Sequence, residues 1–219
     1  LKEVDPTQHP ALATIRRFAP IGERGVDLFF VLSGFLITGI LLRTKHKPHY
    51  FRNFIARRAL RIFPLYFLSL VVRLWLLRRF LDTNTFEMAQ KEQAYLWTYM
   101  SNFRMAWLNE WCFGAFDHFW SLAVEEHFYL VWPAAVLLLN RQRLLMMCIF
   151  IIASAGIGRT FAAMDSRYDV AVSVATFFRA DALAMGAMLA ILLTSSISRD
   201  TIRQVAWIAV ASLLPALVA

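Results

Sequence analysis

The chain has 219 residues, of which 59% are hydrophobic, 15% aromatic and only 17% charged, with a mean hydropathy of +0.52. Soluble domains average about 45–50% apolar and about 25% charged residues, so this composition excludes a soluble globular protein, a disordered chain, a fibrous repeat and a disulfide scaffold. The net charge of +8 is typical of membrane proteins whose basic loops face anionic headgroups. We therefore expect an integral membrane protein in contact with the lipid bilayer, with no nucleic-acid partner.

Apolar runs predict an all-α fold, a polytopic transmembrane helix bundle with about five complete spans and one truncated span. A helix needs about 20 apolar residues to cross the bilayer. In chain order the spans are predicted at residues 25–42, 62–80, 119–139, 144–162, 177–194 and 205–219, the last of them truncated. The connection at 81–118 is polar and Trp-rich, and its apolar patch at 94–108 is expected to be interfacial or re-entrant.

The two ends predict that this sequence is a fragment. It begins at Leu1 with neither an initiator Met nor a signal peptide, and it stops at Ala219 inside the apolar run 205–219. We therefore expect residues 1–219 to form part of the transmembrane domain of a longer protein.

The charges of the connections predict the orientation. Residues 43–61 carry seven basic side chains and no acidic one, so the positive-inside rule places this stretch in the cytoplasm. The connections on the opposite side are, taken together, more acidic than basic; they are residues 1–24, 81–117 and 163–180. We expect a multi-pass protein of the cell membrane whose sequence begins on the outer side.

Four carboxylates lie within the predicted spans, each toward the outer end of its span. They are Asp27, Glu125, Glu126 and Asp181. A charge at membrane depth is costly and normally has a partner or a function. Two interpretations stay open: structural ion pairs, such as one between Arg179 and a neighbouring carboxylate, or a shared polar cavity.

The segment WSLAVEEHFYL at 120–130 has the most specific pattern of polar residues. At 3.6 residues per turn, Ser121, Glu125 and Tyr129 form one stripe on an otherwise apolar helix. Glu126 and His127 project to neighbouring faces. Such a stripe suits binding of a sugar hydroxyl or transfer of a proton, or it serves only to hold helices together.

The segment FRNFIARRALRIFPLY at 51–66 is basic where a helix is expected to enter the membrane from the cytoplasm. Arg58 and Arg61, at i and i+3, share a face. Guanidinium groups suit phosphate recognition, while an ordinary positive-inside anchor is the alternative. Pro64 is expected to break or kink the helix. No histidine or cysteine has metal-ligand spacing, so no metal is expected.

Four blocks in this order resemble the membrane-bound acyltransferase-3 family, often called the OafA/YrhL type. The blocks are GVDLFFVLSGFLI, RRALRIFPLY, WSLAVEEHFYLVWP and RADALAMGAMLAILL, and the resemblance extends over residues 22–193. It implies an O-acyltransferase of a bacterial inner or plasma membrane. Such an enzyme moves an acyl group, usually acetyl, from cytoplasmic acyl-CoA to a hydroxyl of an extracytoplasmic carbohydrate or glycolipid. Acyl-CoA would be the donor substrate, with no bound cofactor.

The resemblance also assigns expected roles to single residues. Arg58 and Arg61 match the family's RxxR motif and are expected to bind acyl-CoA. Glu125, Glu126 and Asp27 are expected to support catalysis by orienting the acceptor or the base. The residues expected at the acceptor site or its cavity are Trp120, Ser121, Tyr129, Arg179 and Asp181.

The family's catalytic histidine belongs to its first helix, which we expect upstream of Leu1. Residues 1–219 alone are therefore expected to be inactive. At His127 this sequence departs from the glutamine of the family pattern, and we assign no catalytic role to His127.

Two further function classes stay open. A transporter or flippase for a polar or lipid-linked substrate also needs buried charges around a central cavity, and a membrane sensor would use the charges only to hold helices together. Consumption of the thioester separates an acyltransferase from both.

Overall fold

The computed structural model describes residues 10–76, 83–162 and 164–194, and within these residues the regular structure is helical, with no strand. The predicted all-α fold is confirmed. The long helices are α1 (Pro10–Thr44), α2 (Tyr50–Val71), α6 (Phe119–Leu138), α7 (Arg141–Ala162) and α9 (Thr176–Leu193). The short ones are η1 (Val72–Leu76, a π-helix), α3 (Thr83–Lys91), α4 (Gln93–Trp97), α5 (Ser101–Leu108), η3 (Gly114–Phe116), η4 (Ser166–Tyr168) and α8 (Asp169–Val174).

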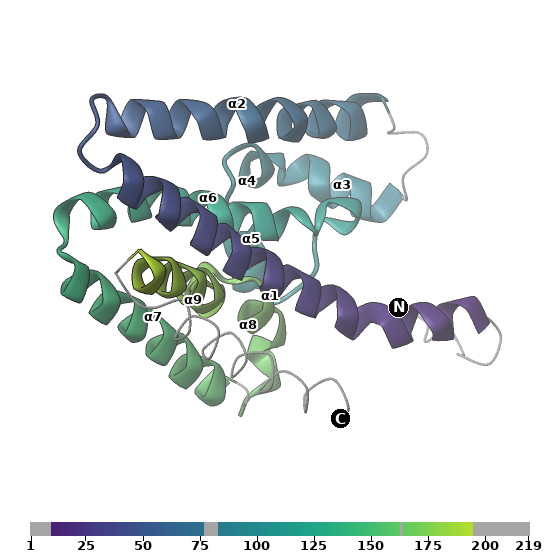
Figure 1. Ribbon diagram of the computed structural model, residues 1–219. Helices are drawn as coiled ribbons and strands as arrows, with labels where there is room; N and C mark the ends of the chain where they lie inside the picture. Colours follow the sequence, from purple (N-terminus) through teal and green to yellow (C-terminus); the bar gives the residue numbers. More distant parts are fainter. Residues whose placement is uncertain (1–9, 77–82, 163, 195–219) are drawn as a thin grey trace.

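Helix α9 packs between α1 and α7 (Figure 1). Two glycines let α1 and α9 touch backbone to backbone. A Cβ on Gly34 would lie 2.0 Å from the Leu183 carbonyl oxygen, and one on Gly186 would lie 1.9 Å from the Val31 carbonyl oxygen. Small residues at such crossings are a common device of membrane helices, which pack by close van der Waals contact. This crossing fixes α9 against α1.

Among the described residues, three helical stretches are long and apolar enough to cross a membrane: Arg24–Thr44, Arg141–Ala162 and Asp169–Leu193. They contain the expected spans 25–42, 144–162 and most of 177–194. The third includes α8 and α9, which are separated by the extended Ala175 at ψ 135°. Residues 77–80 and the expected truncated span 205–219 lie outside the described residues.

The expected spans 62–80 and 119–139 are not among these three stretches. Helix α2 begins at Tyr50, twelve residues before the expected start, and four arginines lie in its first twelve residues. Glu125, Glu126 and His127 lower the mean hydropathy of α6. Both helices nevertheless form, and α2 continues through Pro64 instead of ending there. Whether they cross the membrane stays a prediction.

Helix α2 runs antiparallel to α6, as three contacts along the pair show. Just before α2, Lys45 Nζ donates to the Leu139 carbonyl (2.9 Å), and within it Tyr50 OH donates to the Pro133 carbonyl (3.1 Å). Further along, the rings of Tyr66 and Phe119 lie 4.9 Å apart. Positions near residue 58 of α2 therefore face residues near 126 in the first half of α6.

The connection between α2 and α6 folds into short helices. Its apolar patch forms α4 and α5, in which Leu96 and Met105 are fully buried. Asn109, just after α5, accepts hydrogen bonds from the first amides of α8 through its Oδ1. The apolar patch is therefore packed against protein, beside α6 and α8.

Candidate active site around the buried glutamates of α6

Glu125 is 3% exposed and faces α1 and α2 from the second turn of α6. Its carboxyl group interacts with the hydroxyls of Ser33 and Tyr129 and with the charges of Arg58 and Arg61. The two hydroxyls lie 2.5 Å apart, and the Arg58 guanidinium lies 4.6 Å from the centroid of the Tyr129 ring. Glu125 Oε1 has no hydrogen-bond partner among the described residues. The site therefore combines a buried carboxylate oxygen that can accept a hydrogen bond, two hydroxyl groups and the positive charge of Arg58.

The position of Arg58 differs from the sequence-based expectation. We expected Arg58 and Arg61 at the cytoplasmic entrance and Glu125 toward the outer end of its span. Because α2 begins at Tyr50, Arg58 lies more than two turns inside the helix, over the Tyr129 ring, and its charge acts on the Glu125 carboxyl group. Arg58 is partly buried, whereas Arg61 is exposed. The structure thus brings together two groups that the sequence analysis assigned to opposite ends.

The expected Ser121–Glu125–Tyr129 stripe is only partly realised. Glu125 and Tyr129 share a site, but Ser121 Oγ donates to the carbonyl of His118 at the start of the same helix (3.0 Å). The serine at the site is Ser33 of α1, which the sequence analysis missed. The sequence signal that could have identified Ser33 is its polar side chain within the largely apolar span 25–42.

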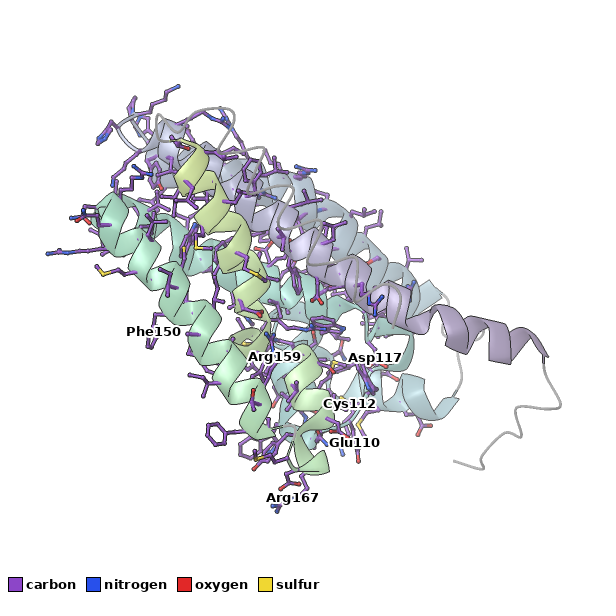
Figure 2. All side chains as sticks on the ribbon, turned by 60° about the horizontal axis from the view of Figure 1, so that its bottom comes forward. Glu110, Cys112, Asp117, Phe150, Arg159 and Arg167 are labelled. Carbon is purple, nitrogen blue, oxygen red and sulfur yellow. The ribbon has the colours of Figure 1, made fainter. Side chains whose placement is uncertain are left out.

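Asp27 and Asp181 each pair with an arginine. Arg179 Nη1 donates to Asp27 (2.9 Å), joining α9 to α1, and its guanidinium lies 5.3 Å from the centroid of a Trp120 ring. Arg159 of α7, labelled in Figure 2, pairs with Asp181 of α9. For these two carboxylates the structure supports the ion-pair interpretation, and both pairs hold α9 to its neighbours.

A second polar cluster lies on the next face of α6 and comprises Glu126, His127, Tyr99, Asn102 and Thr176. His127 Nδ1 lies 2.8 Å from Thr176 Oγ1, and Asn102 Nδ2 donates to the same hydroxyl at 2.9 Å. The charge of Glu126 acts on the Tyr99 phenol, and the His127 ring interacts with the Tyr99 main chain. Sequence analysis singled out Glu126 and noted His127, but missed the other three.

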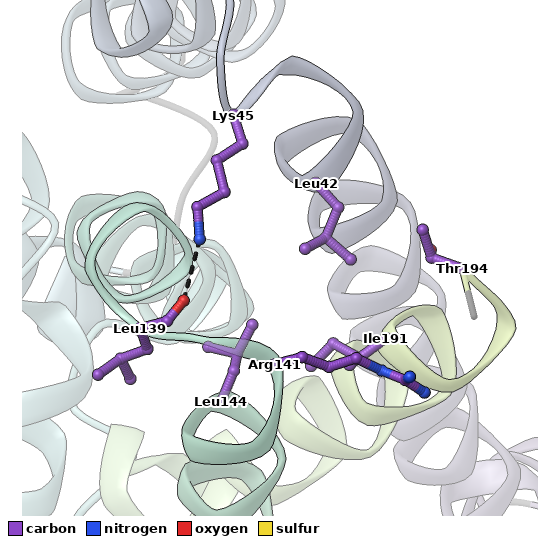
Figure 3. A pocket seen from close by; sticks show the side chains of 7 residues that line it. All are labelled: Leu42, Lys45, Leu139, Arg141, Leu144, Ile191 and Thr194. Atoms are coloured by element: carbon purple, nitrogen blue, oxygen red, sulfur yellow. Dashed lines mark hydrogen bonds between the residues drawn. The ribbon is translucent and has the colours of Figure 1, made fainter.

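A pocket of about 210 Å³ lies where α6 ends and α7 begins, with basic and apolar side chains around it (Figure 3). Its lining residues are Leu42, Lys45, Leu139, Arg141, Leu144, Ile191 and Thr194. Leu139 follows Tyr129 by ten residues, which is about 15 Å along a helix. This end carries the loop that the charges predict to be cytoplasmic. Glu110, Cys112 and Asp117 lie at the opposite end of the bundle (Figure 2).

Comparison with known proteins identifies the family. The family described as "Acyltransferase domain" matches residues 4–217. The peptidoglycan O-acetyltransferase OatA of Listeria monocytogenes is 36% identical over 124 residues, covering 53% of this chain and 20% of the relative. The O-acetyltransferase OatA of Staphylococcus aureus is 29% identical over 181 residues, covering 72% of this chain and 30% of the relative.

A protein of Haemophilus influenzae is 30% identical over 127 residues, and the match covers 53% of this chain and 50% of that protein. The chain thus spans between a fifth and a half of the length of these relatives. No solved structure matches it significantly. With nearly its whole length matched by the acyltransferase domain, the chain belongs to the acyltransferase-3 family.

Proposed function

We propose that this chain forms part of a membrane O-acyltransferase that moves an acyl group, most simply acetyl, from cytoplasmic acyl-CoA to a hydroxyl of an extracytoplasmic carbohydrate. The observation that carries the proposal is the buried Glu125, which lies among hydroxyls beside Arg58. Acyl transfer to an alcohol needs a group that holds or deprotonates the alcohol and positive charge for the donor. Two relatives are named as O-acetyltransferases, and the name of the Listeria relative, a peptidoglycan O-acetyltransferase, supports an envelope polymer as acceptor.

The donor is a phosphorylated thioester, which explains the basic residues. Arg58 is partly buried beside the site, and Lys45 and Arg141 line the pocket at the end predicted to be cytoplasmic. Guanidinium groups bind phosphate oxygens through paired hydrogen bonds. These residues favour entry of acyl-CoA from the cytoplasmic end, with its thioester directed toward the middle of α6.

The reaction exchanges one bond to the acyl carbon for another. The acceptor oxygen attacks the thioester carbonyl, a C–O bond forms, the C–S bond breaks, and the proton of the hydroxyl ends on the coenzyme A thiol. We propose that Glu125 and Glu126 orient the hydroxyl and the base that removes its proton. Following the family pattern, that base is a histidine of a helix outside residues 1–219.

The proposal is tested by measuring thiol release and label transfer with the full-length protein and radiolabelled acetyl-CoA. We expect the free coenzyme A thiol to appear in proportion to acetyl groups on the carbohydrate. Movement of a substrate across the membrane without thioester cleavage would instead identify a transporter and overturn the proposal.

Replacing Arg58 with lysine should raise the KM for acetyl-CoA about 10-fold, because a point charge loses the two-pronged contact with phosphate. The matched control is Arg57→Lys, since Arg57 is the exposed neighbour on the same helix. Steady-state kinetics with varied acetyl-CoA checks this. Equal KM values for the two variants would indicate that Arg58 only anchors the helix at the cytoplasmic membrane surface.

The predicted sidedness is checked by cysteine labelling in intact cells. Lys47 and Glu110 are exposed at opposite ends of the described bundle. We expect Glu110→Cys to react with an impermeant maleimide, and Lys47→Cys to react only after permeabilisation. Cys112 and Cys148 add little background, because both are buried and burial raises the pKa of Cys112 to about 11, which leaves little reactive thiolate at neutral pH. The reverse labelling pattern would invert the topology.

A further inference from the structure

The second polar cluster contains four buried atoms that have no hydrogen-bond partner among the described residues. They are Tyr99 OH, Asn102 Oδ1, Glu126 Oε1 and His127 Nε2. Tyr99 is 8% exposed and Asn102 is 0% exposed. A buried polar group without a hydrogen-bond partner is costly, so four of them on neighbouring residues favour a ligand that supplies the missing partners.

From this geometry we propose that Tyr99, Asn102, Glu126 and His127 form a subsite for a neutral ligand that carries hydroxyl groups. Under the proposed function this ligand is the carbohydrate acceptor, and the inference rests on that function for the role of the ligand in the reaction. Binding itself is argued from the cluster alone.

The hydrogen bonds around Thr176 set which groups His127 and Asn102 present to a ligand. The Thr176 hydroxyl accepts from the Asn102 amide (2.9 Å) and lies 2.8 Å from His127 Nδ1. In the tautomer in which this hydroxyl donates to Nδ1, the hydrogen of the neutral imidazole sits on Nε2, and in the other tautomer Nε2 is an acceptor. With its amide nitrogen also donating to the Val174 carbonyl (3.3 Å), Asn102 presents only its Oδ1 acceptor.

The cluster therefore offers both kinds of hydrogen-bonding group. His127 Nε2 donates or accepts according to its tautomer, Asn102 Oδ1 and Glu126 Oε1 accept, and Tyr99 OH does either. A sugar hydroxyl also donates and accepts, so it satisfies this set, whereas a phosphate would be repelled by Glu126 and an acyl chain would leave every atom unpaired. Phe103, 46% exposed, adds an apolar surface with its ring 4.9 Å from the His127 ring.

The backbone at Tyr99 holds the phenol in place. Tyr99 has φ 57°, a left-handed conformation that is rare for an aromatic residue and that clusters at ligand sites. Its ring stacks on Tyr66 with centroids 4.2 Å apart, and Tyr66 is itself fixed by a hydrogen bond to the Leu96 carbonyl (2.6 Å). The Tyr99 hydroxyl is thus positioned in advance, although no described side chain uses it.

Helix α6 then carries two sites on adjacent faces, because consecutive residues of an α-helix differ by about 100°. Glu125 faces Arg58 and the hydroxyls of Ser33 and Tyr129, while the charge of Glu126 acts on Tyr99 and His127 lies against Thr176 at the start of α9. This arrangement deepens the proposed function, because it gives the carbohydrate a binding cluster next to the carboxylate that orients its reacting hydroxyl.

The test uses Tyr99→Phe in the full-length protein, with the neutral N-acetylglucosamine tetrasaccharide as the probe. Loss of one hydrogen bond should weaken tetrasaccharide binding in calorimetry, and raise the acceptor KM, about 3- to 10-fold. The KM for acetyl-CoA should stay unchanged. Thermal stability should be unchanged or higher, since the removed hydroxyl has no partner among the described residues. Tyr168→Phe, at an exposed tyrosine outside the cluster, is the matched control.

Equal tetrasaccharide affinity for Tyr99→Phe and the wild-type protein, or no binding by the wild-type protein, would overturn this subsite. Binding that weakens in Tyr99→Phe while no acetyl transfer occurs would support the subsite and count against the proposed function. Failure of the subsite and failure of the proposed function therefore give different results.

Discussion

Replacing Glu125 with glutamine in the full-length protein should lower kcat for acetyl transfer about 100-fold, because the base can remove the proton efficiently only while the carboxylate orients it and the hydroxyl, and acid–base catalysis contributes about 100- to 10,000-fold. Glutamine keeps the shape of the side chain and can still contact Ser33 and Tyr129, so the fold should be retained. It cannot accept hydrogen bonds at both terminal atoms or balance the charge of Arg58. Initial rates at saturating acetyl-CoA measure the effect.

The matched control for this variant is Glu110→Gln, because Glu110 is exposed and lies away from the site. It should keep kcat within about twofold, as surface substitutions usually have small effects. If Glu125→Gln retained a similar rate, Glu125 would be a structural residue, and the mechanism would have to be built around Glu126.

Substituting alanine for Gly34 or Gly186 should destabilise the protein by about 1–3 kcal/mol or more, the usual cost of overpacking. The added Cβ would meet a backbone carbonyl oxygen at 2.0 or 1.9 Å. A backbone atom cannot swing aside as a flexible side chain does, so α1 and α9 must separate. Thermal unfolding in detergent, followed by tryptophan fluorescence, measures the change.

Gly156 of α7 provides the control for the glycine variants, because a Cβ there would have no atom within 4 Å. Alanine at this helical position should leave stability unchanged or raise it by up to about 1 kcal/mol through better helix propensity. Equal unfolding temperatures for Gly34→Ala and Gly156→Ala would contradict the close crossing of α1 and α9.

Much of the fold could be predicted from the sequence, because a long apolar run by itself determines a membrane helix. The expected spans 25–42 and 144–162 fall within α1 and α7. Helix α2 was less predictable. Its early arginines resemble a cytoplasmic loop, whereas burial of Tyr50 and Phe54 continues the helix back to residue 50.

The residues of the candidate site could be predicted only in part from the sequence. Helical periodicity placed Glu125 and Tyr129 on one face, but not the partner that α1 supplies, since Ser33 and Tyr129 are 96 residues apart. The bond between His127 and Thr176 likewise spans 49 residues. Contacts of this kind depend on how helices cross, and a single sequence contains no periodic signal for them.

In the proposed mechanism, donor and acceptor meet at α6 from opposite ends of the bundle. Sealed proteoliposomes that contain the full-length protein in one orientation test it directly, with radiolabelled acetyl-CoA on the side of Lys47 and an oligosaccharide on the side of Glu110. We expect acetylated oligosaccharide to form in this arrangement, and Glu125→Gln vesicles to form almost none. Transfer that requires acetyl-CoA and oligosaccharide on the same side of the membrane would contradict the account.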